Sequence, residues 1–214
     1  MSLMPQSLKP NSNRTRRNDP VGLRARILDI AADLFQTRGY HATSMQDLMQ
    51  ATGVSGGALH HHFPSKKSLA LAVIVERVAP AVREAWIDPV RAAPLLDRGV
   101  SRVFAEIIAG IEERGSVSGC PLNNLALELA LSGTEFRYAV DAVFVEWQIA
   151  LGERIGETRA GARLDRAQRM GAAAFIISVY SGSMTLAKAA QNASALRGAA
   201  KVLSCWLKER GFTQ

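Results

Sequence analysis

The sequence is short of the residues that build disulfide frameworks and metal sites. Its 214 residues include two cysteines, Cys120 and Cys205, and four histidines, and aromatic residues make up 6% of the chain. So few cysteines in a chain of this size exclude a disulfide-rich secreted scaffold and favour free thiols in a reducing compartment. The chain also shows no secretory signal pattern at its start. We therefore predict a soluble, cytoplasmic protein.

Acidic residues are scarce at one end of the chain. Residues 1–67 hold nine Lys and Arg against four Asp and Glu, a net charge of +5, whereas residues 68–214 hold seventeen against fifteen. No acidic residue occurs from Ala51 to Val75. A basic segment is the electrostatic footprint of phosphate binding, so we expect nucleic acid to bind the N-terminal part.

Patterns typical of metalloenzymes and nucleotide-binding enzymes are missing. The sequence contains no H-E-x-x-H string and no phosphate-binding loop of the Walker type. His60, His61 and His62 are consecutive, so on a helix they point about 100° apart and do not converge on one ion. A structural zinc site would also lack its cysteines. We predict that the protein is not an enzyme and that it binds no metal or cofactor.

An uncharged run of eighteen residues, Met170 to Ala187, reaches the length of a short membrane span. Three serines and a threonine interrupt this run. A buried helix is therefore the preferred interpretation, and we predict no membrane partner.

The most informative stretch runs from Thr43 to Lys67. Ser44 can cap a short helix with apolar residues on one face, and Gly53 supplies the left-handed position at its end. Ser55 can cap a second short helix, which Pro64 stops. Two short helices joined by a glycine-containing turn predict a helix-turn-helix motif, whose second helix can enter the DNA major groove.

The rest of the chain predicts an all-α protein in two parts. A helix that opens at Asp19 and ends before Gly39 completes a three-helix head in residues 19–65. Residues 66–214 predict a larger helical body for ligand binding and dimerisation. The first body helix should run from Lys66 to about Trp86, because Pro89 follows. Residues 1–18, rich in Pro, Asn, Ser and basic residues, predict a flexible basic arm, either a solvated tail or a contact to DNA.

Two stretches resemble a known family. Residues 26–73 read RILDIAADLFQTRGYHATSMQDLMQATGVSGGALHHHFPSKKSLALAV, and this stretch resembles the DNA-binding domain of TetR-family transcriptional regulators. Residues 119–129, GCPLNNLALEL, resemble one subgroup of the family's ligand-binding domains, which includes regulators of multidrug and flavonoid responses. The resemblance implies a homodimer that binds a near-palindromic double-stranded DNA operator and releases it when a small effector binds.

The same resemblance implies which residues contact DNA. They are Thr43, Ser44, Gln46, Ser55, Gly57, Ala58, His60, His61 and Lys66. Thr43, Ser44 and Lys66 match phosphate-contacting positions, and the residues from Ser55 onward match groove-facing ones. The sequence departs from the family pattern twice. Gly56 stands where lysine is frequent and removes a possible contact, while His60 stands where tyrosine is usual and keeps a donor with less stacking area.

Two further sites are expected in the body. Aromatic residues on different body helices are candidates for an apolar effector pocket that takes a small, apolar or aromatic molecule, namely Trp86, Phe104, Phe136, Phe144 and Trp147. The alternative for each of them is ordinary core packing. The last two helices are apolar on more than one face, which predicts a homodimer interface that includes Ala174, Ser178, Gly182 and Trp206.

These observations predict a DNA-binding transcriptional regulator, a repressor rather than an activator. Two alternatives stay open, a sequence-neutral DNA-packaging protein and an α-helical enzyme. A packaging protein would bind unrelated duplexes equally, whereas a regulator should prefer its operator by about a thousandfold or more.

Overall fold

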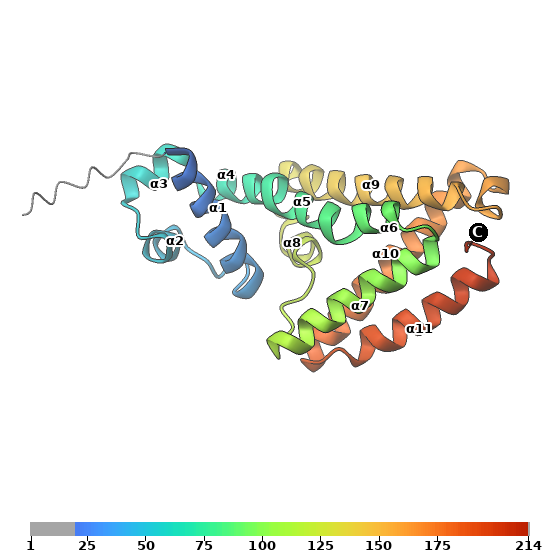
Figure 1. The fold of residues 1–214 in the computed structure, drawn as a ribbon. Helices are drawn as coiled ribbons and strands as arrows, with labels where there is room; N and C mark the ends of the chain where they lie inside the picture. The colour runs from blue at the N-terminus through green and yellow to red at the C-terminus, as the bar shows by residue number, and fades with distance from the viewer. Residues whose placement is uncertain (1–19, 214) are drawn as a thin grey trace, which may run out of the picture.

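The computed structural model describes residues 20–213, and every regular element in that range is a helix. The predicted all-α class is therefore confirmed. The predicted cap Asp19 and the basic arm of residues 1–18 lie outside the described residues. Three helices at the N-terminal end form what we call the head, and the remaining helices form the body (Figure 1).

The head consists of α1 (Pro20–Thr37), α2 (Met45–Thr52) and α3 (Gly56–His62). Apolar side chains at helical spacing on α1 meet those of the two short helices in a shared core, with Ile27, Phe35, Leu48, Leu59 and Phe63 at 3% exposure or less. This burial keeps α2 and α3 together although each is too short to be stable alone.

A continuous helical rod from Lys66 to Ala92 joins the head to the body. Its parts are α4 (Lys66–Val73), the π-turn η1 (Ile74–Val78), α5 (Ala79–Val82), the π-turn η2 (Arg83–Ile87) and α6 (Asp88–Ala92). The prediction that the rod ends near Trp86 because of Pro89 is wrong. Pro89 lies inside the rod, which ends six residues later than expected.

The π-turns explain how two prolines fit inside this rod. The Ala79 N–H donates to the Ile74 carbonyl and the Asp88 N–H donates to the Arg83 carbonyl, five residues back in each case. Pro80 and Pro89 follow directly after these donors. A proline has no N–H, and its ring clashes with the carbonyl four residues before it in an α-helix. A wider turn immediately before the proline relieves that clash, so the helix continues.

The body helices pack beside and below the rod (Figure 1). They are α7 (Leu96–Arg114), α8 (Pro121–Leu129), α9 (Thr134–Gly156), the short 3-10 helix η3 (Gly161–Arg163), α10 (Arg166–Ala190) and α11 (Ser194–Glu209). Helix α9 lies along the rod and packs on α10, and α10 packs on α11. Helix α8 contacts both α1 of the head and η1 of the rod, so it lies at the junction of head and body.

Helices α10 and α11 leave apolar surface uncovered. Helix α10 is long and apolar enough to cross a membrane by length and composition alone, and 39% of its most apolar stretch is buried inside the protein. Phe175 and Leu186 on α10 are 43% and 63% exposed, and Val202 on α11 is 70% exposed. Ser178 and Gly182, two predicted interface residues, are also exposed, and Trp206 is half-buried against Phe175 with ring centroids 4.6 Å apart.

Candidate nucleic-acid interface

Helix α2 begins with a complete capping box. The Ser44 hydroxyl donates to the Asp47 carboxylate at 2.5 Å and accepts from the Asp47 backbone N–H at 3.1 Å. The Ser44 backbone N–H also donates to that carboxylate, and these hydrogen bonds lower the pKa of Asp47. Gly53 ends the helix with φ +69°, a left-handed conformation that favours glycine. The turn between the two helices therefore has a fixed geometry, as the sequence predicts.

Helix α3 exposes most of the residues predicted to face DNA. Leu59 points inward and is fully buried, whereas Ser55, Gly57, His60 and His61 are exposed. Ala58 is half-buried and Gln46, on α2, is exposed. A Cβ atom at Gly57 would meet nothing within 4 Å, so the backbone there is open to close approach by another molecule.

The half-buried Gly56 faces α2 rather than solvent. A Cβ atom at this position would lie 3.2 Å from the Met49 sulfur, which is a tight contact with the end of a flexible side chain. The glycine lets α3 pack closely on α2. Glycine at position 56, where the family often has lysine, therefore removes a possible DNA contact and also allows the two helices to pack closely.

Thr43 does not present its hydroxyl to solvent. Its side chain is fully buried, and Oγ1 donates to the Gly39 carbonyl at 2.8 Å. A phosphate contact through this hydroxyl, which the family resemblance implies, does not fit that geometry. The buried hydroxyl instead holds the loop that leads into α2.

Lys66, at the start of the rod, also holds this loop. Its ammonium donates to the carbonyls of Tyr40 and Thr43 at 3.1 and 3.0 Å and lies 4.3 Å from the centroid of the Tyr40 ring. An ammonium has three protons, so one donor remains available. The sequence indicates Lys66 but not Tyr40, because the two residues are 26 positions apart and no local pattern connects them.

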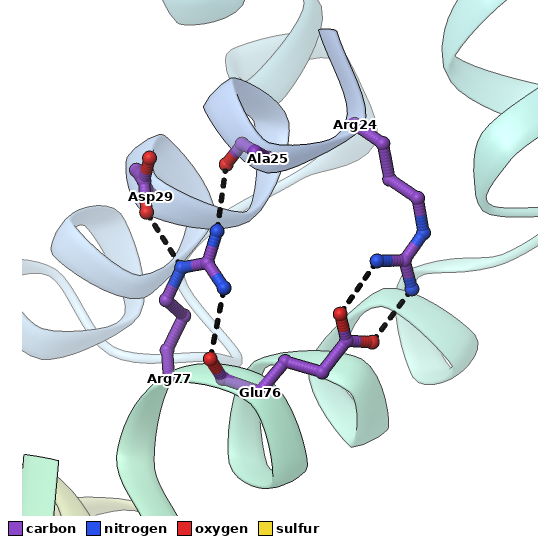
Figure 2. A network of polar contacts seen from close by, with 5 residues as sticks. All are labelled: Arg24, Ala25, Asp29, Glu76 and Arg77. Carbon is purple, nitrogen blue, oxygen red and sulfur yellow. Dashed lines mark hydrogen bonds and ion pairs between the residues drawn. The ribbon is translucent and has the colours of Figure 1, made fainter. Parts of the chain in front are cut away.

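An ion-pair network fixes α1 to the rod (Figure 2). Arg24 donates to both carboxylate oxygens of Glu76 at 2.6 Å, and Arg77 donates to the Asp29 carboxylate at 2.6 Å and to the Ala25 carbonyl at 3.2 Å. These pairs border a groove of about 380 Å³ between head and rod, lined by Val21, Arg24, Ala25, Leu28, His62, Glu76 and Arg77. Helix α3, which leads into the rod, is thus attached to a supported helix rather than to a free linker.

Three of the five aromatic residues predicted for the effector pocket meet in the body. Trp86 lies 5.7 Å from Phe104 and 5.0 Å from Trp147, measured between ring centroids. Tyr180 of α10, which the sequence analysis missed, completes the cluster at 4.8 Å from Trp86. Helical spacing in the sequence could have indicated Tyr180, because it shares one buried face of α10 with Ile176, Ile177 and Met184.

The other two residues of that prediction lie elsewhere. Phe144 is half-buried and stacks on the outer side of Trp147 at 6.5 Å. Phe136 packs on Tyr40 of the head at 5.6 Å, so it belongs to the contact between head and body. Its assignment to the pocket does not fit this position. Both lie on α9, but Phe136 is near its beginning, next to the head.

The aromatic cluster contains polar atoms without ordinary partners. The buried indole N–H of Trp147 makes no hydrogen bond within residues 20–213, and the buried indole N–H of Trp86 lies beside the Tyr180 hydroxyl without ideal hydrogen-bond geometry. Burial raises the pKa of the Tyr180 hydroxyl well above its ordinary value, with a further contribution from neighbouring Cys120. Burial likewise raises the pKa of the Cys120 thiol. Buried polar atoms of this kind are uncommon and call for an explanation.

Residues 53–57 read GVSGG, which spells the G-x-S-x-G pattern of hydrolase nucleophiles. That pattern needs a sharp turn from a strand into a helix. Here it connects two helices, and the Ser55 hydroxyl accepts the Ala58 N–H at 3.3 Å as a helix cap. The string therefore has a structural role in the helix-turn-helix motif.

The comparisons with known proteins agree with this geometry. Residues 27–73 match the bacterial regulatory proteins of the tetR family, and residues 98–202 match the C-terminal domain of LmrA/YxaF-like transcriptional regulators. Two relatives from Bacillus subtilis strain 168 are HTH-type transcriptional regulators. LmrA is 25% identical over 81% of this chain and 90% of its own length, and YxaF is 30% identical over 63% and 70%.

A similar fold occurs in a solved structure. The crystal structure of a TetR transcriptional regulator from Chloroflexus aurantiacus J-10-FL superposes with a TM-score of 0.73 at 29% identity, covering 89% of this chain and 96% of that one. The match spans head and body together. This chain therefore belongs to the TetR family of bacterial regulatory proteins and is a DNA-binding transcriptional regulator.

Proposed function

We propose that the protein is a cytoplasmic repressor that binds a near-palindromic operator as a homodimer and leaves it when a small effector binds the body. One observation carries the proposal. A capped helix-turn-helix exposes Ser55, Gly57, His60 and His61 at one short helix, and a supported rod attaches this helix to a larger helical body. We assign DNA contact to the head, and ligand binding and dimerisation to the body.

On DNA, phosphate contacts would supply most of the affinity and base contacts the sequence preference. We propose Gln46, His60 and His61 as exposed donors, with Gly57 and Ala58 allowing close approach in the groove. Lys66 has one ammonium proton left for a phosphate beside the two it donates to carbonyls. Two recognition helices about 34 Å apart would fit successive major grooves.

The uncovered faces of α10 and α11 support the homodimer. Phe175, Val202 and Trp206 present apolar surface on one side of these helices, and Ser178 and Gly182 lie on the exposed part of α10 where another helix can approach closely. A second copy that covers this face would bury surface that a single chain leaves in water.

The effector site that we propose is the aromatic cluster of Trp86, Phe104, Trp147 and Tyr180. The rings favour an apolar or aromatic molecule. The buried indole N–H of Trp147, which has no acceptor within residues 20–213, favours one that also carries an acceptor oxygen. An effector that prefers a different spacing of the recognition helices would shift the population away from the DNA-bound form.

The test compares binding of the purified protein to the DNA upstream of its own gene and to scrambled DNA of equal length, at one physiological salt concentration. We expect the upstream fragment to bind about a thousandfold more tightly. If both fragments bind equally, the operator lies elsewhere or is absent, and bound sequences are then selected from the whole genome. Selection without enrichment of any sequence would contradict the repressor proposal and favour the packaging alternative.

A further inference from the structure

The loop between α7 and α8 is held by side chains from three helices. Gln191, the C-cap residue of α10, accepts the Val117 N–H and donates to the Val117 carbonyl, both at 3.1 Å. Asn124 of α8 donates to the Ser118 carbonyl at 2.9 Å. Gly119 has φ +91°, and a Cβ atom there would lie 2.9 Å from Asn124 Oδ1, so glycine is required. These contacts hold the loop against α8 and the end of α10.

Two adjacent residues of this loop point to opposite parts of the molecule. The Gly119 carbonyl accepts a hydrogen bond of 2.7 Å from Gln36 Nε2, which belongs to α1 of the head. The next side chain, Cys120, is 5% exposed and lies beside the Tyr180 hydroxyl in the aromatic cluster. A single peptide bond therefore separates a contact to the head from a contact to the proposed effector site.

The amide of Gln36 is held on both of its sides. Its Nε2 atom donates to Gly119, and its Oε1 atom accepts from Asn124 Nδ2 at 3.0 Å. Asn124 in turn accepts from Lys188 of α10 at 3.2 Å. Because donor and acceptor of the same amide are engaged, a movement of the loop must either move α1 or break these hydrogen bonds.

We propose that Gln36 is a positioning residue that couples the aromatic cluster to the DNA-binding head through the Gly119–Cys120 peptide. This inference rests on the proposed effector site, and it names the route by which that site acts. A molecule that displaces Tyr180 or Cys120 shifts the loop, and the loop carries the end of α1 with it. The Arg24–Glu76 pair holds the same helix against the rod at its other end, so α1 tilts rather than translates.

The test is a double-mutant cycle with operator affinity as the readout. Cys120→Leu enlarges the side chain beside Tyr180 and mimics a disturbance of the cluster, and Gln36→Leu removes the amide. We expect Cys120→Leu alone to weaken operator binding about fivefold, and to change it less than twofold in the Gln36→Leu background, because coupled residues are not additive. Equal effects in both backgrounds would overturn the proposal.

Thr37→Ala supplies the matched control. Thr37 neighbours Gln36, and among residues 20–213 its hydroxyl donates to the Asp33 carbonyl of the same helix alone. The Cys120→Leu effect should therefore persist in the Thr37→Ala background. Where circular dichroism shows that Cys120→Leu does not fold, Cys120→Ala replaces it; this variant disturbs the cluster by removing the thiol beside Tyr180, and its effect should likewise shrink in the Gln36→Leu background.

Hydrogen exchange supplies a readout that needs no operator. Cys120→Leu should speed amide exchange in residues 45–62 when Gln36 is present and leave it unchanged when Gln36 is leucine. This result would support the coupling independently of DNA binding. Absence of any operator preference would contradict the proposed function but not the coupling. If Cys120→Leu changes amide exchange in residues 45–62 equally with glutamine and with leucine at position 36, the coupling is contradicted, whatever the operator preference.

Discussion

Arg24 and Glu76, on different helices and 52 positions apart, form a bidentate ion pair with both N–O distances at 2.6 Å. The pair joins the head to the π-turn η1 of the rod (Figure 2). Each side chain is a little more than one-third exposed, so solvent screens the interaction. Its consequence is therefore a modest and pH-dependent contribution to stability.

We expect Glu76→Gln to lower the free energy of unfolding by about 0.5 to 1 kcal/mol at pH 7. The hydrogen bonds from Arg24 lower the pKa of Glu76 in the folded protein. Stability from a carboxyl group with a lowered pKa is complete above its unfolded pKa, about 4.3, and disappears as the pH falls through the folded value. Urea unfolding at pH 7 and pH 3.5 should show the difference between wild type and variant shrinking.

The control for this experiment is Glu113→Gln. Glu113 is exposed on α7 and takes no part in the network. Its substitution should leave the free energy of unfolding within about 0.5 kcal/mol of wild type at both pH values. A Glu76→Gln difference that stays constant with pH would show that the pair does not titrate as described.

His60 provides a direct test of the recognition helix. We expect His60→Ala to weaken operator binding several-fold or more at matched salt, because the exposed imidazole is lost from the centre of α3 while inward-facing Leu59 keeps the helix packed. Fluorescence anisotropy with labelled operator measures the change. Glu113→Ala, an exposed change on α7 outside the helix-turn-helix, should leave the affinity unchanged, and unchanged affinity for His60→Ala would remove His60 from the DNA contacts.

Lys66 allows phosphate contact and loop positioning to be separated. We expect Lys66→Met to weaken operator binding and to reduce the slope of log affinity against log salt concentration by about 0.9, the value for one phosphate contact. The physical reason is the third ammonium proton, which remains after the bonds to Tyr40 and Thr43. Weaker binding with an unchanged salt slope would mean that Lys66 acts only by holding the loop.

Local patterns predict the head well and its long-range contacts poorly. The caps Ser44 and Ser55 and the left-handed Gly53 depend on neighbouring residues, so the sequence alone indicates them correctly. The prediction fails at Pro89 because a proline in the sequence indicates a break, whereas the π-turn directly before it lets the helix continue. Gln36 and Gly119, separated by 83 positions, share no sequence signal at all.

In the candidate sites, too, the sequence predicts features that depend on local spacing and misses those that depend on distant contacts. Exposure of Ser55, Gly57, His60 and His61 follows from helical spacing, and so does the burial of Leu59. Burial of Thr43 does not follow, because it depends on a hydrogen bond to Gly39 within an irregular loop. The pattern of an aromatic residue on a body helix does not indicate which neighbour the ring contacts, and Phe136 contacts Tyr40 rather than Trp86.

The homodimer can be tested at Phe175, which is 43% exposed on α10 and contacts Trp206 of α11. We expect Phe175→Arg to raise the dimer dissociation constant by about a hundredfold or more, because it removes an aromatic contact and places an unpaired charge in the interface. Sedimentation velocity measures the change. Leu127→Arg is the matched control, because Leu127 is 77% exposed on α8 and lies outside the α10–α11 face. Dimers that persist in Phe175→Arg but dissociate in Leu127→Arg would place the interface on α8 instead.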